Sequence, residues 1–158
     1  MSSSTKTRRA LGGIVLGGIA LGFSIFARVP EAQADVGPNA EVLVIHATNC
    51  DKPYTDPAIG VMPALRYNCY KLLDRKGLPL RAGQASTMGL PNGRTFQIAL
   101  NEVTSERPPR YKVSASISQP DGKFNKLADI TAESNKRFHL GGFAYQGGAL
   151  VLAVNIGP

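Results

Sequence analysis

The residues that could do chemistry in this 158-residue chain are two histidines, two cysteines and scattered carboxylates. A nucleophilic enzyme needs a serine or cysteine beside a base, usually a histidine oriented by a third group. His46 lies in an apolar run and His139 in a short strand-like segment, so we interpret each as a satisfied structural or surface histidine. No nucleophile-elbow, calcium-loop, phosphate-loop or dinucleotide motif occurs. The sequence therefore predicts no catalytic residue, no cofactor and a protein that is not an enzyme.

The carboxylates offer the one catalytic alternative. Two of them held on either side of a glycosidic bond could hydrolyse it. The acidic residues considered for such a pair are Glu102, Glu106, Asp129 and Glu133. Chance proximity is a sufficient explanation for any pair, so a small secreted hydrolase or hydrolase inhibitor, using these carboxylates or His139, is kept as the second hypothesis.

The two cysteines, Cys50 and Cys69, are predicted to form a disulfide, because an even count in an exported domain favours a bridge. Closing a loop of about 20 residues stabilises a fold by roughly 3 kcal/mol in the chain-entropy model. Two free thiols are the first alternative. A metal site that uses both cysteines with His46 and Asp51 is the second, but the His46–Cys50 spacing suits a helix and residues 41–47 resemble a strand. No metal is therefore predicted.

Two loops are the candidate binding regions, because the end loops of a β-sandwich are where recognition usually occurs. Gly141–Gly148 places two aromatics between glycine pairs, although Phe143 is expected to fold back onto the core. Glu106–Arg110, with the sequence ERPPR, is a rigid basic loop, for which a solvated surface is the simpler interpretation. The residues singled out as possible binding residues are Tyr145, Gln146, Arg107 and Arg110.

The elements that would position these loops are β-strands. In Tyr111–Ser118 apolar and polar residues alternate, which is typical of a strand with one buried face. A turn at Gln119–Gly122 and a less regular partner, Phe124–Ile130, complete a hairpin in which we expect a bulge. The other predicted strands are Glu41–Ala47, Tyr67–Leu73, Gln84–Leu90, Thr95–Leu100, Arg137–Leu140 and Ala149–Ile156.

Seven or eight short strands with regular turns predict an all-β fold, an antiparallel β-sandwich of the Ig-like or a similar kind. A small β-barrel is the alternative. Between the strands, the composition predicts a turn at Asp74–Gly77 and a glycine-rich connection over Gly141–Gly148. It also predicts one helical turn at Pro57–Val61, capped by Asp56.

Residues 1–34 have the pattern of a signal peptide. A basic start precedes the uncharged run Ala10–Ala27, and Ala32–Ala34 fits a signal-peptidase site. Arg8 and Arg9 resemble a twin-arginine signal, and an ordinary secretory signal is equally consistent. An uncleaved membrane anchor is the third option, because the run approaches the roughly 20 residues of a membrane span. The predicted mature chain is a single domain, residues 35–158, exported to the periplasm or the exterior.

The formal charge of +7 includes +3 from the predicted signal, so the remaining chain carries +4 (7 − 3). Its basic residues are scattered among acidic ones, and the chain has no tryptophan. A nucleic-acid interface needs a basic stripe or stacking aromatics in a known motif. We therefore predict no nucleic-acid partner and weak adhesion at most to anionic envelope polymers.

Four segments carry a resemblance: Tyr70–Leu73, Leu90–Arg94, the alternation Phe96-x-Ile98-x-Leu100, and Gly147–Ala153. In this order they are similar to small exported β-rich proteins of uncharacterised role in Gram-negative bacteria. The resemblance spans roughly residues 65–156, and its motifs are turn and strand residues. It implies a β-rich fold and an envelope location, and it brings no activity or catalytic residues.

The first hypothesis is therefore an exported, non-enzymatic binding or accessory module of the bacterial cell envelope, with an unknown protein or envelope polymer as its partner. A subunit of an envelope complex, anchored by an uncleaved N-terminal helix, is the third hypothesis. A membrane contact is expected only in that case.

The intact mass of the native protein from each cell fraction tests the predicted processing. We expect a soluble species that begins at Asp35, because Ala32–Ala34 provides the cleavage site, with two thiols that react with a label only after reduction. A full-length species in the membrane fraction would contradict cleavage and indicate an anchor.

Overall fold

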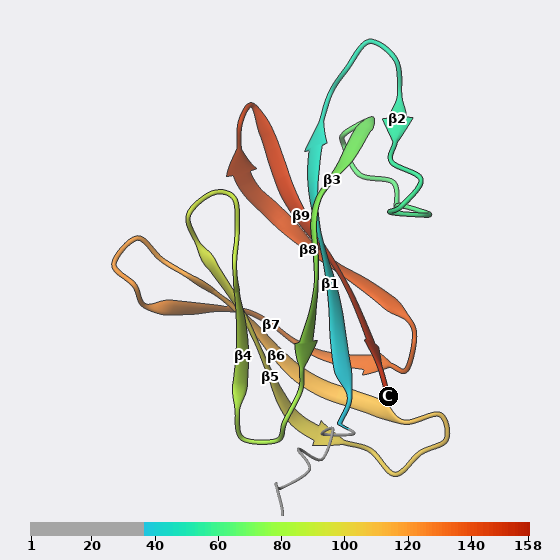
Figure 1. The fold of residues 1–158 in the computed structure, drawn as a ribbon, viewed down its shortest axis with the longest axis vertical. Coiled ribbons are helices and arrows are strands. Elements are labelled where there is room, and N and C mark those ends of the chain that lie inside the picture. Colours follow the sequence, from blue (N-terminus) through green and yellow to red (C-terminus); the bar gives the residue numbers. More distant parts are fainter. Residues whose placement is uncertain (1–36) are drawn as a thin grey trace, which may run out of the picture. The chain divides into compact units, whose positions relative to one another are not determined.

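The computed structural model describes residues 37–158, which form nine β-strands in two sheets, with no helix in that range (Figure 1). The predicted antiparallel β-sandwich is confirmed, with one strand more than expected and no closed barrel. The strands are β1 (Asn39–Thr48), β2 (Tyr54–Thr55), β3 (Cys69–Pro79), β4 (Ala85–Gly89), β5 (Thr95–Val103), β6 (Arg110–Ser118), β7 (Phe124–Glu133), β8 (Arg137–Tyr145) and β9 (Gly148–Gly157).

The two sheets have five and four strands. The five-stranded sheet has the order β2-β3-β1-β9-β8, and the four-stranded sheet has the order β4-β5-β6-β7. All pairs are antiparallel except the short β2–β3 pair. The chain changes sheet after β3 and again after β7, so the N-terminal and C-terminal strands lie next to each other.

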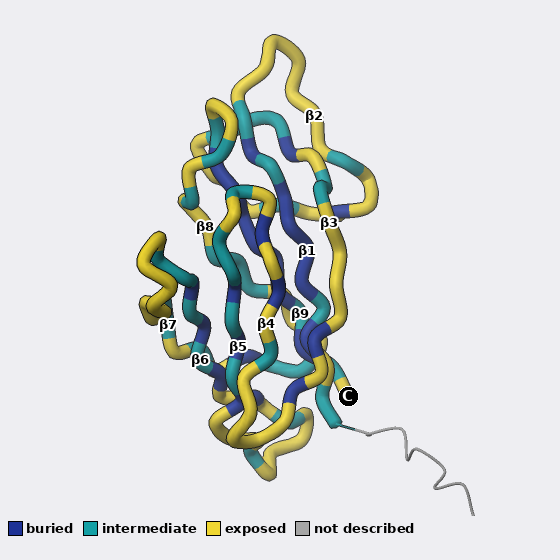
Figure 2. Tube along the Cα trace, turned by 60° about the vertical axis from the view of Figure 1, so that its left-hand side comes forward, coloured by how far each residue is buried: buried dark blue, intermediate teal, exposed yellow. Residues whose placement is uncertain are grey.

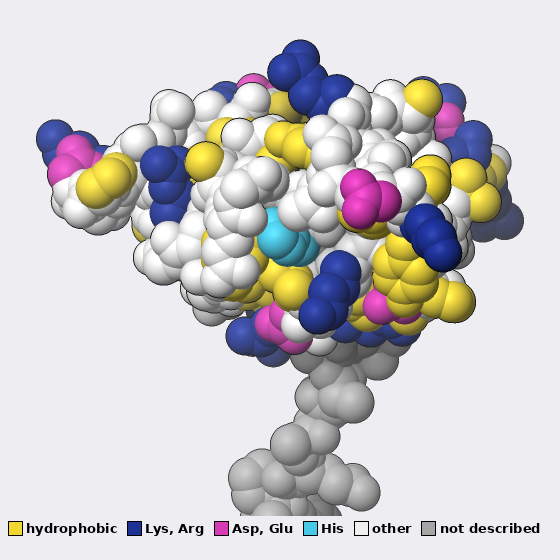
Figure 3. Space-filling view, turned by 90° about the horizontal axis from the view of Figure 1, so that it is seen from above, with side chains coloured by type: hydrophobic (Ala, Val, Ile, Leu, Met, Phe, Trp, Pro, Cys, Tyr) yellow, Lys and Arg dark blue, Asp and Glu magenta, His cyan; other side chains and the backbone are white. Residues whose placement is uncertain are grey.

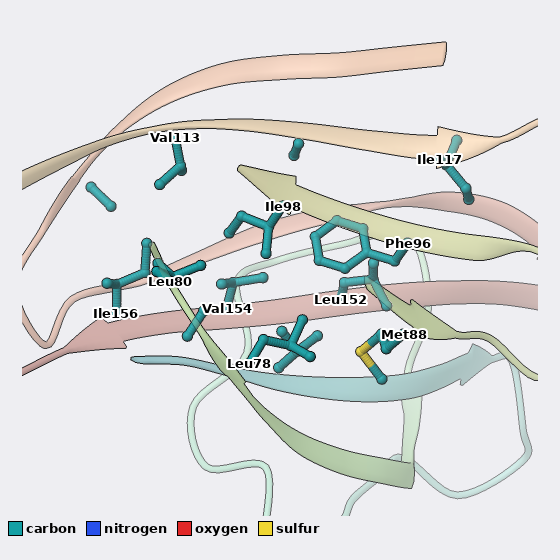
Figure 4. Close-up of a cluster of buried hydrophobic side chains, with 14 of the residues drawn as sticks. Leu78, Leu80, Met88, Phe96, Ile98, Val113, Ile117, Leu152, Val154 and Ile156 are labelled. Atoms are coloured by element: carbon teal, nitrogen blue, oxygen red, sulfur yellow. The ribbon is translucent and has the colours of Figure 1, made fainter. Parts of the chain in front are cut away.

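The main core lies between the sheets, as alternating apolar residues require. Phe96 and Ile98 of β5 are fully buried and lie toward Leu152 and Val154 of β9 (Figure 4). The central strand β1 is also buried on its other face, and Figure 2 shows it dark along most of its length. The strand predicted at Glu41–Ala47 is therefore present, and its apolar residues on both faces are buried.

The β6–β7 hairpin is the element that the sequence predicts best. Tyr111 and Val113 are buried, as predicted from the alternation. The expected bulge occurs opposite Ala115 and Ser116, where Leu127 has no direct partner in the ladder. On the solvent side, the Ser114 hydroxyl lies 2.6 Å from Asp129 Oδ1.

The predicted turn at Asp74–Gly77 is wrong, because β3 continues through it to Pro79. Every residue of this stretch pairs with β1, and a register shift between Val44 and Ile45 accommodates one extra residue. The short β2 covers only the beginning of β3, and the charged side chains of residues 74–76 are exposed to solvent. Placing these side chains in a strand therefore costs little stability. Cross-strand pairing with β1 therefore overrides the turn composition.

The predicted connection Gly141–Gly148 is also mostly a strand. β8 extends to Tyr145, and only Gln146 and Gly147 form the turn before β9. Gly142 has a φ of +99°, and the ladder shifts register between Gly141 and Phe143. A bulge at a glycine thus allows the strand to continue where composition indicates a loop.

The predicted helical turn at Pro57–Val61 is a simple turn over residues 57–59. The Asp56 carbonyl accepts a hydrogen bond from the Ile59 amide at 2.9 Å, and its carboxylate accepts one from the Ala58 amide at 3.0 Å. The capping role of Asp56 is present, but no helical hydrogen bonds follow it.

Replacing a central core side chain should strongly destabilise the sandwich. We expect Ile98→Ala to lower the free energy of unfolding by about 3 kcal/mol, because Ile98 is fully buried between the sheets. Val103→Ala on the same strand is the matched control, because Val103 is 46% exposed and should change stability by about 0.5 kcal/mol or less. Equal shifts in urea denaturation for the two variants would contradict this packing.

Candidate ligand-binding site

The outer face of the five-stranded sheet is apolar and is covered by residues 49–68, which we call the strap. The strap leaves β1, contains β2 and returns into β3. Its Ile59 is 1% exposed and joins a second buried cluster. The cluster members from β1, the strap, β3 and β9 are Leu43, Ile45, Ala47, Ile59, Tyr70, Val151 and Ala153. The strap is therefore what allows the sheet to be apolar on both faces.

Three covalent and polar contacts hold the strap in place. The predicted disulfide joins Cys50 to Cys69, with Cα atoms 6.1 Å apart, and so ties the first part of the strap to the start of β3. Arg75 Nη2 of β3 donates a hydrogen bond to the Ala58 carbonyl at 2.9 Å. Arg137 Nη1 of β8 donates to the Ile59 carbonyl. These contacts lie on both flanks of the sheet, so the strap is held on either side of Ile59.

A pocket of about 660 Å³ opens between the strap segment Ala64–Tyr67 and the outer face of β8 and β9. Its walls are mostly apolar side chains and glycine backbone. The lining residues are Ala64, Leu65, Arg66, Tyr67, His139, Leu140, Gly141, Gly142, Ala144, Gly148, Ala149 and Val151. Gly148 has no room for a side chain, because a Cβ there would lie 2.2 Å from the Ala47 carbonyl oxygen. Glycine at this position is therefore required by the packing of β9 on β1.

Among the described residues that line the pocket, Arg66 alone has a full formal charge at neutral pH. It is exposed, and no ion pair or hydrogen bond of its side chain is found within residues 37–158. By contrast, the side chains of Arg75, Arg110 and Arg137 each form a hydrogen bond or an ion pair. In the part of the chain that the structure describes, no aspartate or glutamate lines the pocket.

His139 forms the polar part of the pocket floor. Burial lowers its pKa, and the positive charge of Arg137 lowers it further, so the imidazole is neutral at pH 7. Its Nε2 atom is buried and has no hydrogen-bond partner among residues 37–158, and the same holds for Oδ1 of Asn155 on the neighbouring strand β9. His139 lies in a strand, as the sequence analysis predicts. The expectation of a satisfied histidine is wrong for this residue, which is partly exposed to the pocket.

Tyr145 and Gln146, two of the predicted binding residues, do not line the pocket. Tyr145 packs against the inner core, and its ring makes an edge contact with His46 at 5.0 Å between centroids. His46 is a satisfied histidine as predicted, because its Nε2 lies 3.2 Å from the Tyr145 carbonyl oxygen. Phe143 also packs against the inner core. Gln146 is exposed in the turn with a φ of +41°.

Arg107 and Arg110 lie at the other end of the sandwich. Their loop contacts the β7–β8 turn, where the Ser134 amide donates a hydrogen bond to the Pro109 carbonyl. In the same turn, the Asn135 amide donates a hydrogen bond to the carbonyl of Ile156, near the end of β9. The pocket reaches Val151 of β9, and Ile156 lies five residues, about 17 Å, further along this strand. Arg110 Nε is 3.1 Å from Glu106, and Arg107 is exposed. The two predicted binding loops therefore do not form one site.

The four carboxylates considered for hydrolysis each form an ion pair with a different lysine or arginine side chain. Glu102 binds Lys112, Glu106 binds Arg110, Asp129 binds Lys126 and Glu133 binds Lys136. Hydrogen bonds from Lys126 and Ser114 lower the pKa of Asp129, and the hydrogen bond from Lys136 lowers that of Glu133. Within residues 37–158, no three His, Cys, Asp or Glu side chains gather as metal ligands do, and no helix could cross a membrane.

Sequence reasoning missed the pocket because its walls come from distant segments. One signal was visible: Val61–Leu65 is an apolar run inside a loop. Val61 is 90% and Leu65 39% exposed. On the face seen in Figure 3, hydrophobic side chains reach the surface between scattered Lys, Arg, Asp and Glu side chains.

Comparison with known proteins identifies no relative of this chain. The chain matches no protein-family model, no curated protein and no solved structure. The site must therefore be interpreted from its own geometry.

The state of His139 predicts how stability depends on pH. Its pKa in the folded protein is below the unfolded value of 6.5, so the unfolded chain binds protons first on acidification. Stability should therefore be fully present above pH 6.5 and decline as the pH falls through the lowered pKa. Urea denaturation between pH 8 and about pH 5.5 measures this while the carboxylates remain ionised.

The His139→Asn variant should reduce the decline, because it removes the titrating imidazole. His46→Asn is the comparison variant and should keep the contribution of His139. If the His139→Asn variant lost as much stability at acidic pH as the unchanged protein, the lowered pKa of His139 would not be the cause of that loss.

Proposed function

We propose that this protein is an exported, non-enzymatic binding or accessory module of the bacterial cell envelope, and that it binds its ligand in the strap pocket. The observation that carries the proposal is the pocket itself, formed where a disulfide-tied loop crosses an apolar sheet face. Its volume of about 660 Å³ is within the usual range for small-molecule sites. Mostly apolar walls with few polar groups are also typical of such sites.

Export is supported by two independent features of the chain. Residues 1–34, which lie outside the described residues, have the pattern of a signal peptide. The Cys50–Cys69 disulfide is the kind of bond that persists in an oxidising compartment. On the face seen in Figure 3 the charged side chains are scattered and form no basic stripe of the kind that a nucleic-acid partner would need.

The hydrolase hypothesis has less support. A pair of catalytic carboxylates must face one substrate bond from two sides at a defined separation. Glu102, Glu106, Asp129 and Glu133 are each occupied by their own lysine or arginine, and none of them lines the pocket. We therefore keep binding as the proposed function.

A neutral apolar fluorophore of pocket size tests the proposal. We expect N-phenylnaphthylamine to bind saturably with one site per chain and to gain fluorescence in the apolar pocket. Leu65→Asp should weaken binding by about tenfold or more, because it removes an apolar wall and introduces a charge.

Val103→Asp is the matched control. It replaces another partly exposed apolar residue, 46% against 39% exposed, on a strand of the other sheet. It should leave the affinity unchanged. Absence of saturable binding, or equal loss in both variants, would remove the pocket as the site.

A further inference from the structure

The lining of the strap pocket combines an apolar body with a single positive charge. Leu65, the ring of Tyr67, Ala149 and Val151 provide apolar surface, and Arg66 provides the charge. We propose that the pocket takes a small amphipathic anion, whose apolar part packs on these side chains and whose carboxylate or similar oxyanion pairs with Arg66. This inference rests on the proposed function and specifies the class of ligand.

The charge balance of the lining is the first argument. Arg66 has no partner within residues 37–158, and no acidic residue lines the pocket to neutralise it. His139 is neutral at pH 7 because burial lowers its pKa, so it adds no second charge. A guanidinium beside apolar surface recognises a carboxylate through two parallel hydrogen bonds, so an anion is preferred over a neutral or cationic ligand of the same shape.

The edge strand β8 gives the second argument, because it disfavours an extended peptide as the occupant. Peptides often bind by adding a strand to a free sheet edge. Here the edge runs through Gly141 and Gly142, where the register shifts and Gly142 has a φ of +99°. A bulge of this kind interrupts the row of backbone groups that an added strand needs. A compact ligand is therefore favoured.

Two fluorescent probes that share one aromatic skeleton distinguish the contribution of the anionic group to affinity from that of the apolar body. Anilinonaphthalene sulfonate carries an anionic group on the same aromatic frame as N-phenylnaphthylamine. We expect the sulfonate to bind more tightly to the purified native protein. Arg66→Ala should weaken the sulfonate by about tenfold, as expected for a lost charge-assisted hydrogen bond, and change the neutral probe by less than about twofold.

Two further variants serve as controls. Arg66→Lys keeps the charge and should retain part of the preference for the sulfonate. Lys112→Ala removes one positive charge from the outer face of the other sheet and should leave both affinities unchanged. Urea denaturation of each variant checks that it remains folded.

The outcomes distinguish the two proposals. If both probes bind equally, or if Arg66→Ala and Lys112→Ala weaken the sulfonate alike, the anion inference is overturned while the pocket remains a binding site. If neither probe binds to the folded protein, the proposed function fails together with the inference.

Discussion

The burial of β1 on both faces is the constraint on which the rest of the domain depends. Its inner residues Val42 and Val44 pack against the four-stranded sheet, and its outer residues Leu43 and Ile45 need a second cover. No helix in residues 37–158 is available for this role, so the strap covers the face with Ile59. An irregular loop loses much conformational entropy when it is ordered. The disulfide and the two arginine–carbonyl contacts offset part of that cost, and the pocket lies where the strap leaves β8 and β9 uncovered.

Local patterns predicted the fold class well, because period-two alternation and turn chemistry act within a few residues. The β6–β7 hairpin is an example. The Cys50–Cys69 bridge was predicted on a different ground, the even number of cysteines in a domain expected to be exported. Predictions failed where a distant strand decides the outcome. Asp74–Gly77 has turn composition, but its pairing with β1 keeps it in a strand, and that pairing is not visible from residues 74–77 alone. The site was missed for the same reason, since its walls are more than 70 residues apart in the chain.

The edge strands of both sheets have features that disfavour pairing with strands of other molecules. Exposed edges invite pairing with other chains unless they are short or interrupted. β2 has two residues and β4 has five, while the longer edge strands β7 and β8 each contain a bulge. All four edges in the described domain are therefore short or irregular, which leaves recognition to side chains and loops.

The bulge in β8 has a second consequence, because the same glycines line the pocket. A Cβ on Gly141 would lie 3.2 Å from Val151 Cγ2, and Gly142 has a backbone conformation that side chains rarely allow. Glycine here therefore interrupts the edge and also keeps the pocket floor free of side chains. Because the other lining residues of β8 and β9 besides His139 are apolar or glycine, the charge and the aromatic ring of the site come from the strap, through Arg66 and Tyr67. The loop that covers the apolar face thus also determines what the pocket can bind.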